Sequence, residues 1–176
     1  KTLKDWASSH NWSFYKETRD LEQLSEWRQQ VGGGYFLYLI DGYIDKRKVR
    51  AFDGHKAEGG SGYKVEQCYS TVALDTGIVL KPLFIRTEKF VDTVTDFIGF
   101  NDIDFESAEF SEQLYVKAKD AKWAYDVLSQ EMIDFLLESP RFNVEFHDKN
   151  IIAYRNSFFE VADFEDAIKV ATGIME

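Results

Sequence analysis

The sequence predicts an α+β fold in which helices pack on a mainly antiparallel sheet. Residues 35–86 form a run of strand patterns separated by turns, and two further strand segments follow near 113–118 and 142–154. Helical patterns lie before, between and after these strands, a segregation typical of α+β folds. Parallel pairing needs long crossovers that the strand run lacks. With 176 residues, we expect a single domain over 1–176.

Short helical patterns open the chain. Apolar residues recur at helical spacing over 3–10, directly after Thr2, which is a capping residue type. A second pattern covers 21–31 and ends at three glycines, residues 32–34. We expect this segment, 1–31, to pack onto the sheet, with a short extended piece at 12–14. The glycines are not a phosphate-binding loop, because no Lys-Ser or Lys-Thr follows them.

Turn residues divide the strand run. We expect four antiparallel strands in series, over 35–40, 49–56, 63–74 and 78–85. Gly42 follows an aspartate in the first turn, and the glycine-serine stretch 59–62 predicts a flexible hairpin loop. Pro82 places the last strand at a sheet edge or at a strand start.

Helices and strands alternate in the second half. We expect a helix over 87–98 and one long helix over 121–136, the latter capped by Asp120. Alternation of apolar and polar residues over 142–154 predicts a hairpin. Asp163 is expected to cap the last helix.

Charge and composition exclude several function classes. The formal net charge is -10, which disfavours nucleic-acid binding and direct adsorption to anionic lipid. The basic run 46–50 is interpreted as a solvated hairpin end, with an acidic partner or a lipid headgroup as the alternative. Cys68 is the single cysteine, so no intrachain disulfide forms, and this suits a reducing compartment. No apolar run has the length that spans a bilayer.

An acidic segment over 99–112 contains the first candidate site. Its carboxylates are metal-ligand candidates because hard cations prefer several oxygen ligands. These candidates are Asp102, Asp104, Glu106 and Glu109. The calcium-loop pattern fails, since Ser107 stands where glycine is needed and Gln113 where glutamate is needed. The alternative is a solvated loop whose phenylalanines face a core. No cofactor is expected.

A second candidate site is formed by Asp53, His55 and Cys68. If the hairpin folds symmetrically about the 60–61 bond, Asp53 lies near Cys68 and His55 near Glu66. A Cys-His-Asp arrangement would suit nucleophilic catalysis. The alternative is that cysteine is simply a small buried side chain, and no catalytic residue is assigned.

Aromatic residues are frequent in the strand run. They line a ligand groove, anchor a protein interface or fill the core, and the core is the commoner role. The residues concerned are Tyr35, Phe36, Tyr38, Tyr43, Tyr63 and Tyr69.

Several motifs resemble a family of bacterial and archaeal proteins that share a domain of unknown function. They are Ala51-Phe-Asp-Gly-His55, Gly60-Ser-Gly62, Gln67-Cys-Tyr-Ser-Thr-Val72, Lys81-Pro-Leu-Phe84, Asp102-Ile-Asp-Phe105, Glu109-Phe-Ser111, and Leu3-Lys-Asp-Trp-Ala7 with Asn11-Trp12. The resemblance implies the soluble part of a membrane-tethered protein, with a transmembrane tether upstream of Lys1. It implies no activity. Cys68 stands where the family has another polar residue, which weakens thiol catalysis.

These observations favour a non-enzymatic interaction domain that binds a protein or peptide. We expect it in the cytoplasm or at the cytoplasmic face of a membrane, with no nucleic-acid partner and no direct membrane contact by this segment. One alternative is an enzyme or metal site built on 102–109. A further alternative is a small-ligand sensor, which would need a deep apolar pocket.

Overall fold

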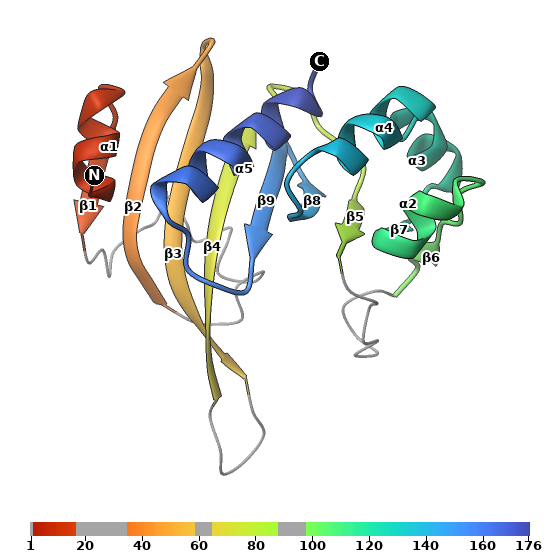
Figure 1. Cartoon of the computed structure of the whole chain (residues 1–176), viewed down its shortest axis with the longest axis horizontal. Coiled ribbons are helices and arrows are strands. Elements are labelled where there is room, and N and C mark those ends of the chain that lie inside the picture. Colours follow the sequence, from red (N-terminus) through yellow and green to blue (C-terminus); the bar gives the residue numbers. More distant parts are fainter. Residues whose placement is uncertain (1, 17–34, 59–64, 88–97) are drawn as a thin grey trace.

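One antiparallel sheet organises the molecule. The computed structural model describes residues 2–16, 35–58, 65–87 and 98–176. Nine strands in these ranges lie in the order β1-β2-β3-β4-β9-β8-β5-β7-β6 (Figure 1). The strands are β1 (Ser13–Lys16), β2 (Tyr35–Ile44), β3 (Arg47–Glu58), β4 (Val65–Asp75), β5 (Leu83–Arg86), β6 (Asn101–Asp102), β7 (Tyr115–Ala118), β8 (Asn143–His147) and β9 (Asn150–Arg155). Every pair is antiparallel, which confirms the predicted α+β class.

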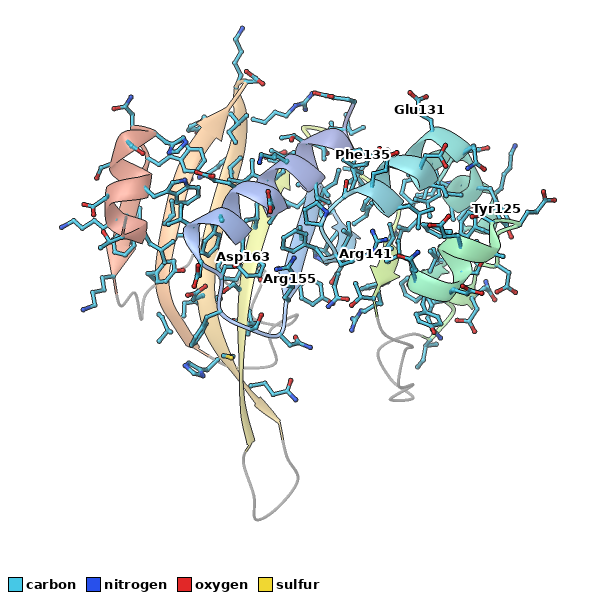
Figure 2. All side chains as sticks on the ribbon, viewed as in Figure 1. Tyr125, Glu131, Phe135, Arg141, Arg155 and Asp163 are labelled. Carbon is cyan, nitrogen blue, oxygen red and sulfur yellow. The ribbon has the colours of Figure 1, made fainter. Side chains whose placement is uncertain are left out.

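Helices cover the sheet in separate places. They are α1 (Leu3–Ser9), α2 (Ala108–Gln113), α3 (Ala121–Val127), α4 (Gln130–Glu138) and α5 (Val161–Gly173). α5 packs on β4 and β9, whereas α2, α3 and α4 gather beside β5, β6 and β7 (Figure 1). Accordingly, Tyr125 and Glu131 lie on the helical end of the molecule, away from Arg155 and Asp163 (Figure 2).

The first helix is joined to the last. Trp6 of α1 is fully buried and its ring stacks on Phe164 of α5, with centroids 5.8 Å apart. Its indole Nε1 donates a hydrogen bond to Glu165 Oε1 at 3.1 Å. Thr2 caps α1 by accepting from the backbone N–H of Asp5. The opening helix is therefore confirmed, and its burial against α5 fixes the edge of the sheet.

Both faces of the central strands are buried. Phe36, Tyr38 and Tyr69 are each less than 9% exposed, which confirms a core role for these three aromatics. Tyr38 faces α5, whereas Phe36 and Tyr69 belong to a second apolar cluster on the opposite face of the sheet, with Phe52. Tyr43 is 64% exposed and therefore does not belong to the core. The side chains of Tyr35 and Tyr63 lie outside the described residues.

The prediction of four neighbouring strands in series was wrong for the fourth strand, β5. β2, β3 and β4 are neighbours, but β9 and β8 lie between β4 and β5. The connection over 76–82 is too long for a tight hairpin and contains Pro82, which cannot donate to a ladder. β5 therefore pairs with β8 and β7 instead.

The prediction of a single long helix over 121–136 was also wrong, because the segment forms two helices, α3 and α4. The chain leaves the helix at Leu128 and starts α4 after Ser129, whose hydroxyl accepts from Met132 N. α5 begins earlier than predicted, because Glu160 is its N-cap and Asp163 lies in its first turn. The expected elements over 21–34 and 59–62, and most of the helix over 87–98, lie outside the described residues.

Candidate functional site

Asp53 is a buried carboxyl group in the centre of the sheet. It lies on β3 opposite Ser70 of β4 and is 5% exposed. Burial raises the pKa of Asp53 above its usual value, although the hydrogen bond from Ser70 and the nearby Tyr38 and His55 act in the opposite direction. The Tyr38 side chain is buried beside Asp53, and burial, followed by the proximity of Asp53, raises the pKa of Tyr38.

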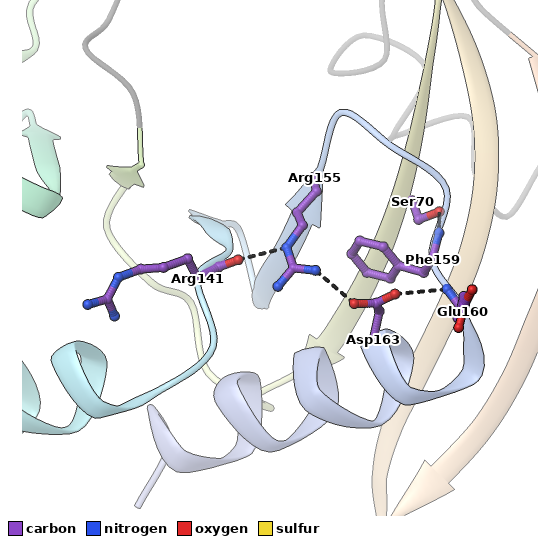
Figure 3. Close-up of polar contacts among 6 residues, drawn as sticks. All are labelled: Ser70, Arg141, Arg155, Phe159, Glu160 and Asp163. Carbon is purple, nitrogen blue, oxygen red and sulfur yellow. Dashed lines mark hydrogen bonds and ion pairs between the residues drawn. The ribbon is translucent and has the colours of Figure 1, made fainter.

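Asp53 fastens the segment that leads into α5. Ser70 Oγ donates to Asp53 Oδ1 and accepts from the backbone N–H of Phe159 at 2.8 Å. Nearby, Arg155 donates to the carbonyl of Arg141 and to Asp163 Oδ1, at 2.7 and 2.8 Å (Figure 3). The buried Ser70 and the half-buried Arg155 each bind a backbone group of another segment, which is a structural role.

The predicted catalytic pairing was wrong in register. Cys68 lies opposite His55, and Asp53 lies opposite Ser70 rather than Cys68. The hairpin is offset by two residues from the expected register, a shift that leaves every side chain on the same face of the sheet, so the alternation of apolar residues could not distinguish the two registers. The ring of His55 contacts Phe158 edge-on, with centroids 5.4 Å apart. None of the three residues lines the groove at the β1 edge of the sheet that is described below.

The acidic segment lies at the opposite end of the sheet. Asp102 belongs to β6 and pairs with Lys117 of β7, whose Nζ is 3.3 Å from Asp102 Oδ1. Asp104, Glu106 and Glu109 are exposed. The segment is anchored by Phe110, which is fully buried, with Ser107 capping α2. Across the described parts of the chain, no three His, Cys, Asp or Glu residues are grouped so as to hold a metal ion.

A shallow groove opens instead at the β1 edge of the sheet. Its volume is about 410 Å³. The residues that line it come from the α1–β1 turn and from β1, β2 and β3, namely His10, Asn11, Trp12, Ser13, Tyr15, Asp41, Gly42, Tyr43 and Lys48. Tyr15 and Tyr43 are 47% and 64% exposed. We call this the edge groove.

Trp12 forms the floor of the edge groove. Its indole lies across the backbone of Gly42, where an added Cβ would stand only 2.1 Å from Trp12 Cδ1. Trp12 Nε1 donates to the carbonyl of Tyr43 at 3.3 Å, and its ring contacts Trp6 and His10. The absence of a side chain at Gly42 is therefore what lets the indole join the turn to β2.

Several polar side chains of the edge groove are held in place by neighbouring groups. Lys48 Nζ lies 3.1 Å from Asp41 Oδ2, whereas Asp41 Oδ1 is buried without a hydrogen-bond partner among the described residues. His10 Nδ1 is 2.9 Å from the carbonyl of Trp6, which only accepts, so a neutral His10 offers Nε2 as an acceptor. Exposed aromatic side chains among oriented polar groups are typical of binding surfaces.

Comparisons with known proteins bear on the fold. No protein-family model matches the sequence, and no curated protein matches it. Among solved structures, the chain is similar to the crystal structure of the mycobacterial trehalose monomycolate transport factor A, TtfA, with a TM-score of 0.76 and 15% identity. The alignment covers 98% of this chain and 89% of that one. At this identity the likeness shows the fold alone. In the ranges that the structure describes, no helix is long and apolar enough to cross a membrane.

Sequence reasoning did not single out the edge groove. Trp12 was expected as part of an extended piece, Tyr15 was not weighed as a binding residue, and Lys48 was considered only within the basic run 46–50. The available signal was the alternation along β2, where Asp41 and Tyr43 flank Gly42. A bulky aromatic on the polar face of a strand is a candidate for an interface.

Proposed function

We propose that this chain is a non-enzymatic interaction domain of a membrane-tethered protein, and that it binds a peptide segment of a partner in the edge groove. The observation that carries the proposal is the pair of exposed tyrosines, Tyr15 and Tyr43, above a floor made by Trp12. Tyrosine and tryptophan dominate binding energy at interfaces because they bury much area at low entropic cost.

The edge groove suits a peptide better than a small ligand. It is open and shallow, whereas small-molecule sites are usually enclosed and bury most of the ligand. Membrane tethering rests on the resemblance of motifs such as Ala51–His55 and Lys81–Phe84 to bacterial and archaeal membrane-tethered proteins.

The alternatives have less support from the geometry. An enzyme built on 102–109 would need desolvated carboxylates, but Asp104, Glu106 and Glu109 face solvent. Asp53 is desolvated, yet its oxygens hold Ser70 and, through it, the backbone of Phe159. A binding role at the edge groove is therefore the better hypothesis.

Selection from a displayed random-peptide library tests the proposal. We expect selected peptides to carry an apolar or aromatic anchor and to bind the purified chain with a measurable Kd by calorimetry. Changing Tyr15 and Tyr43 to Ser should weaken this binding about thirtyfold or more, the usual effect of removing an interfacial hot spot.

Matched controls come from exposed aromatics outside the edge groove. Tyr125→Ser and Phe158→Ser remove side chains that are 49% and 46% exposed. They should leave the Kd unchanged within about twofold. The proposal fails if no peptide is enriched, or if the Tyr15 and Tyr43 variants bind as tightly as the wild type.

A further inference from the structure

The edge groove lies where the sheet ends at β1. Among the strands in the described ranges, β2 is the only neighbour of β1, which borders the sheet beside α1 (Figure 1). A strand in this position presents backbone N–H and C=O groups that can pair with another chain. The register of β2 with its two neighbours shows which residues of β1 present them.

The β2–β3 turn sets the hydrogen-bonding phase of β2. Ile44 and Arg47 flank a two-residue turn whose residues both have positive φ, 48° and 67°. The residues that flank such a turn form a hydrogen-bonded pair, and bonded and non-bonded pairs alternate along an antiparallel ladder. The even-numbered residues from 40 to 44 therefore bond β3, whereas Asp41 and Leu39 direct their backbone groups toward β1.

The same alternation continues into β1. Ser13 and Tyr15 lie opposite the two residues of β2 that face β1, so they form the hydrogen-bonded pairs with β2. The backbone N–H and C=O groups of Phe14 and Lys16 consequently point away from the sheet. β1 thus offers two donors and two acceptors on its outer side, from every second residue.

The contacts of Trp12 agree with this phase. Trp12 precedes Phe14 by two residues, and its N–H donates to the Ala7 carbonyl of α1 at 2.9 Å rather than to β2. No backbone group of another described residue bonds the outward groups of Phe14 and Lys16. Phe14 is half-buried and Lys16 is exposed. Their outward groups repeat at the spacing of alternate residues in a strand, about 6.8 Å, which a second extended backbone matches.

We propose that the partner peptide of the edge groove binds as an added β-strand, with backbone hydrogen bonds to Phe14 and Lys16 and an apolar side chain against Tyr15 and Tyr43. This inference rests on the proposed function, to which it adds the conformation of the peptide. Backbone pairing supplies affinity in such complexes, and alternate side chains supply specificity. Tyr15 and Tyr43 line the groove, so the peptide residue beside Tyr15 is the anchor.

A second copy of the chain is the competing occupant of this edge. Each copy carries a formal charge of -10, which opposes self-association. β1 is also only four residues long and ends in Lys16, a combination that disfavours open-ended pairing of edges. The occupant is therefore a segment of another protein, and we expect the free chain to sediment as a monomer.

A scan of N-methyl groups along a selected peptide tests the backbone pairing. Each methyl group removes one peptide N–H and blocks the approach of a neighbouring strand at that residue. Methylation at every second residue should weaken binding about tenfold or more, whereas methylation between them should change the Kd less than about twofold. Antiparallel pairing makes the anchor a tolerant position and parallel pairing makes it a sensitive one, so the phase also gives the strand direction.

A proline at Lys16 tests the same contact from the protein. Lys16→Pro removes an N–H that points away from β2, and proline is tolerated at such edge positions. This variant should bind the peptide about tenfold or more weakly than Lys16→Ala, which loses the same side chain but keeps the N–H. In the wild type, the Phe14 and Lys16 amides should become protected from hydrogen exchange when peptide binds, whereas those of Ser13 and Tyr15 are protected beforehand.

The outcomes separate the added strand from the proposed function. If a selected peptide binds but tolerates N-methylation at every residue, and Lys16→Pro binds it as Lys16→Ala does, the added strand is refuted and the edge groove is still a peptide site. If no peptide is enriched, the proposed function fails and the added strand with it. A free chain that is already dimeric, with protected Phe14 and Lys16 amides, would overturn the proposal in favour of a second copy.

Discussion

Replacing Gly42 with Ala perturbs the edge groove at its floor. The added Cβ would lie 2.1 Å from Trp12 Cδ1 and 2.2 Å from Trp12 Cγ, far inside van der Waals contact. The backbone of Gly42 is not in the left-handed region, so alanine itself is compatible with the strand. The indole must therefore move, and with it the contacts to Trp6 and to the Tyr43 carbonyl.

Two effects of the added methyl group set the expected coupling free energy between Trp12 and Gly42. Overpacking of this kind costs about 1–3 kcal/mol. In a Trp12→Ala background the obstacle is gone, and Gly42→Ala should then stabilise the protein by about 0.4–1 kcal/mol through the unfolded state. The double-mutant cycle therefore predicts a coupling free energy of about 1.4–4 kcal/mol between positions 12 and 42.

Urea unfolding of the four proteins in the cycle measures this coupling. Tryptophan fluorescence of the folded Gly42→Ala variant should also shift, because the indole is displaced toward solvent. Peptide binding to the edge groove should weaken in the same variant. A coupling below about 0.5 kcal/mol would refute the reasoning, since independent sites are additive within that range.

Three further predictions concern the framework around the site. Burial raises the pKa of Asp53 in the folded protein, so the wild type loses stability as pH rises from the unfolded-state pKa of about 3.9 to the raised pKa of the folded state. The stability of Asp53→Asn relative to wild type should therefore increase across this pH range. A pH-independent difference in the free energy of urea unfolding would contradict this. Arg155→Lys should lower the free energy of unfolding by about 1–3 kcal/mol in urea. The reason is that Arg155 donates a hydrogen bond to the Arg141 carbonyl and its guanidinium lies 3.9 Å from the centroid of the Phe142 ring. Unchanged stability would show that these contacts are dispensable. Ser129→Ala should cost about 1 kcal/mol in thermal unfolding by removing the cap of α4, and a neutral result would argue against a separate helix there.

Local patterns predicted the elements better than their arrangement. The alternation over 143–147 and the apolar residues at 151–153 gave a hairpin that the structure confirms, because one face of each strand is buried. The break at Leu128 was missed since the apolar stripe keeps its helical period across it. Ser129, a capping residue type, with the acidic Glu131 in the turn that follows, was the available signal for a second helix start.

The strand order and the edge groove depend on contacts between residues far apart in the sequence, which local sequence patterns do not indicate. Nothing in residues 76–82 indicates that β9 and β8 will insert between β4 and β5. The edge groove likewise unites Trp12 with Tyr43, which are far apart in sequence, through the close approach at Gly42. The sequence search favoured Asp53, His55 and Cys68 because reactive residue types are conspicuous, yet Asp53 is engaged in fastening the segment before α5.

The most direct test of the edge groove is to map a selected peptide on the protein by amide chemical shifts. The account predicts the largest changes at Trp12 to Tyr15 and at Asp41 to Tyr43, with little change in the hairpin of β8 and β9. If the changes centre on Asp53, Cys68 or the acidic segment 102–109 and spare the edge groove, the central claim is contradicted.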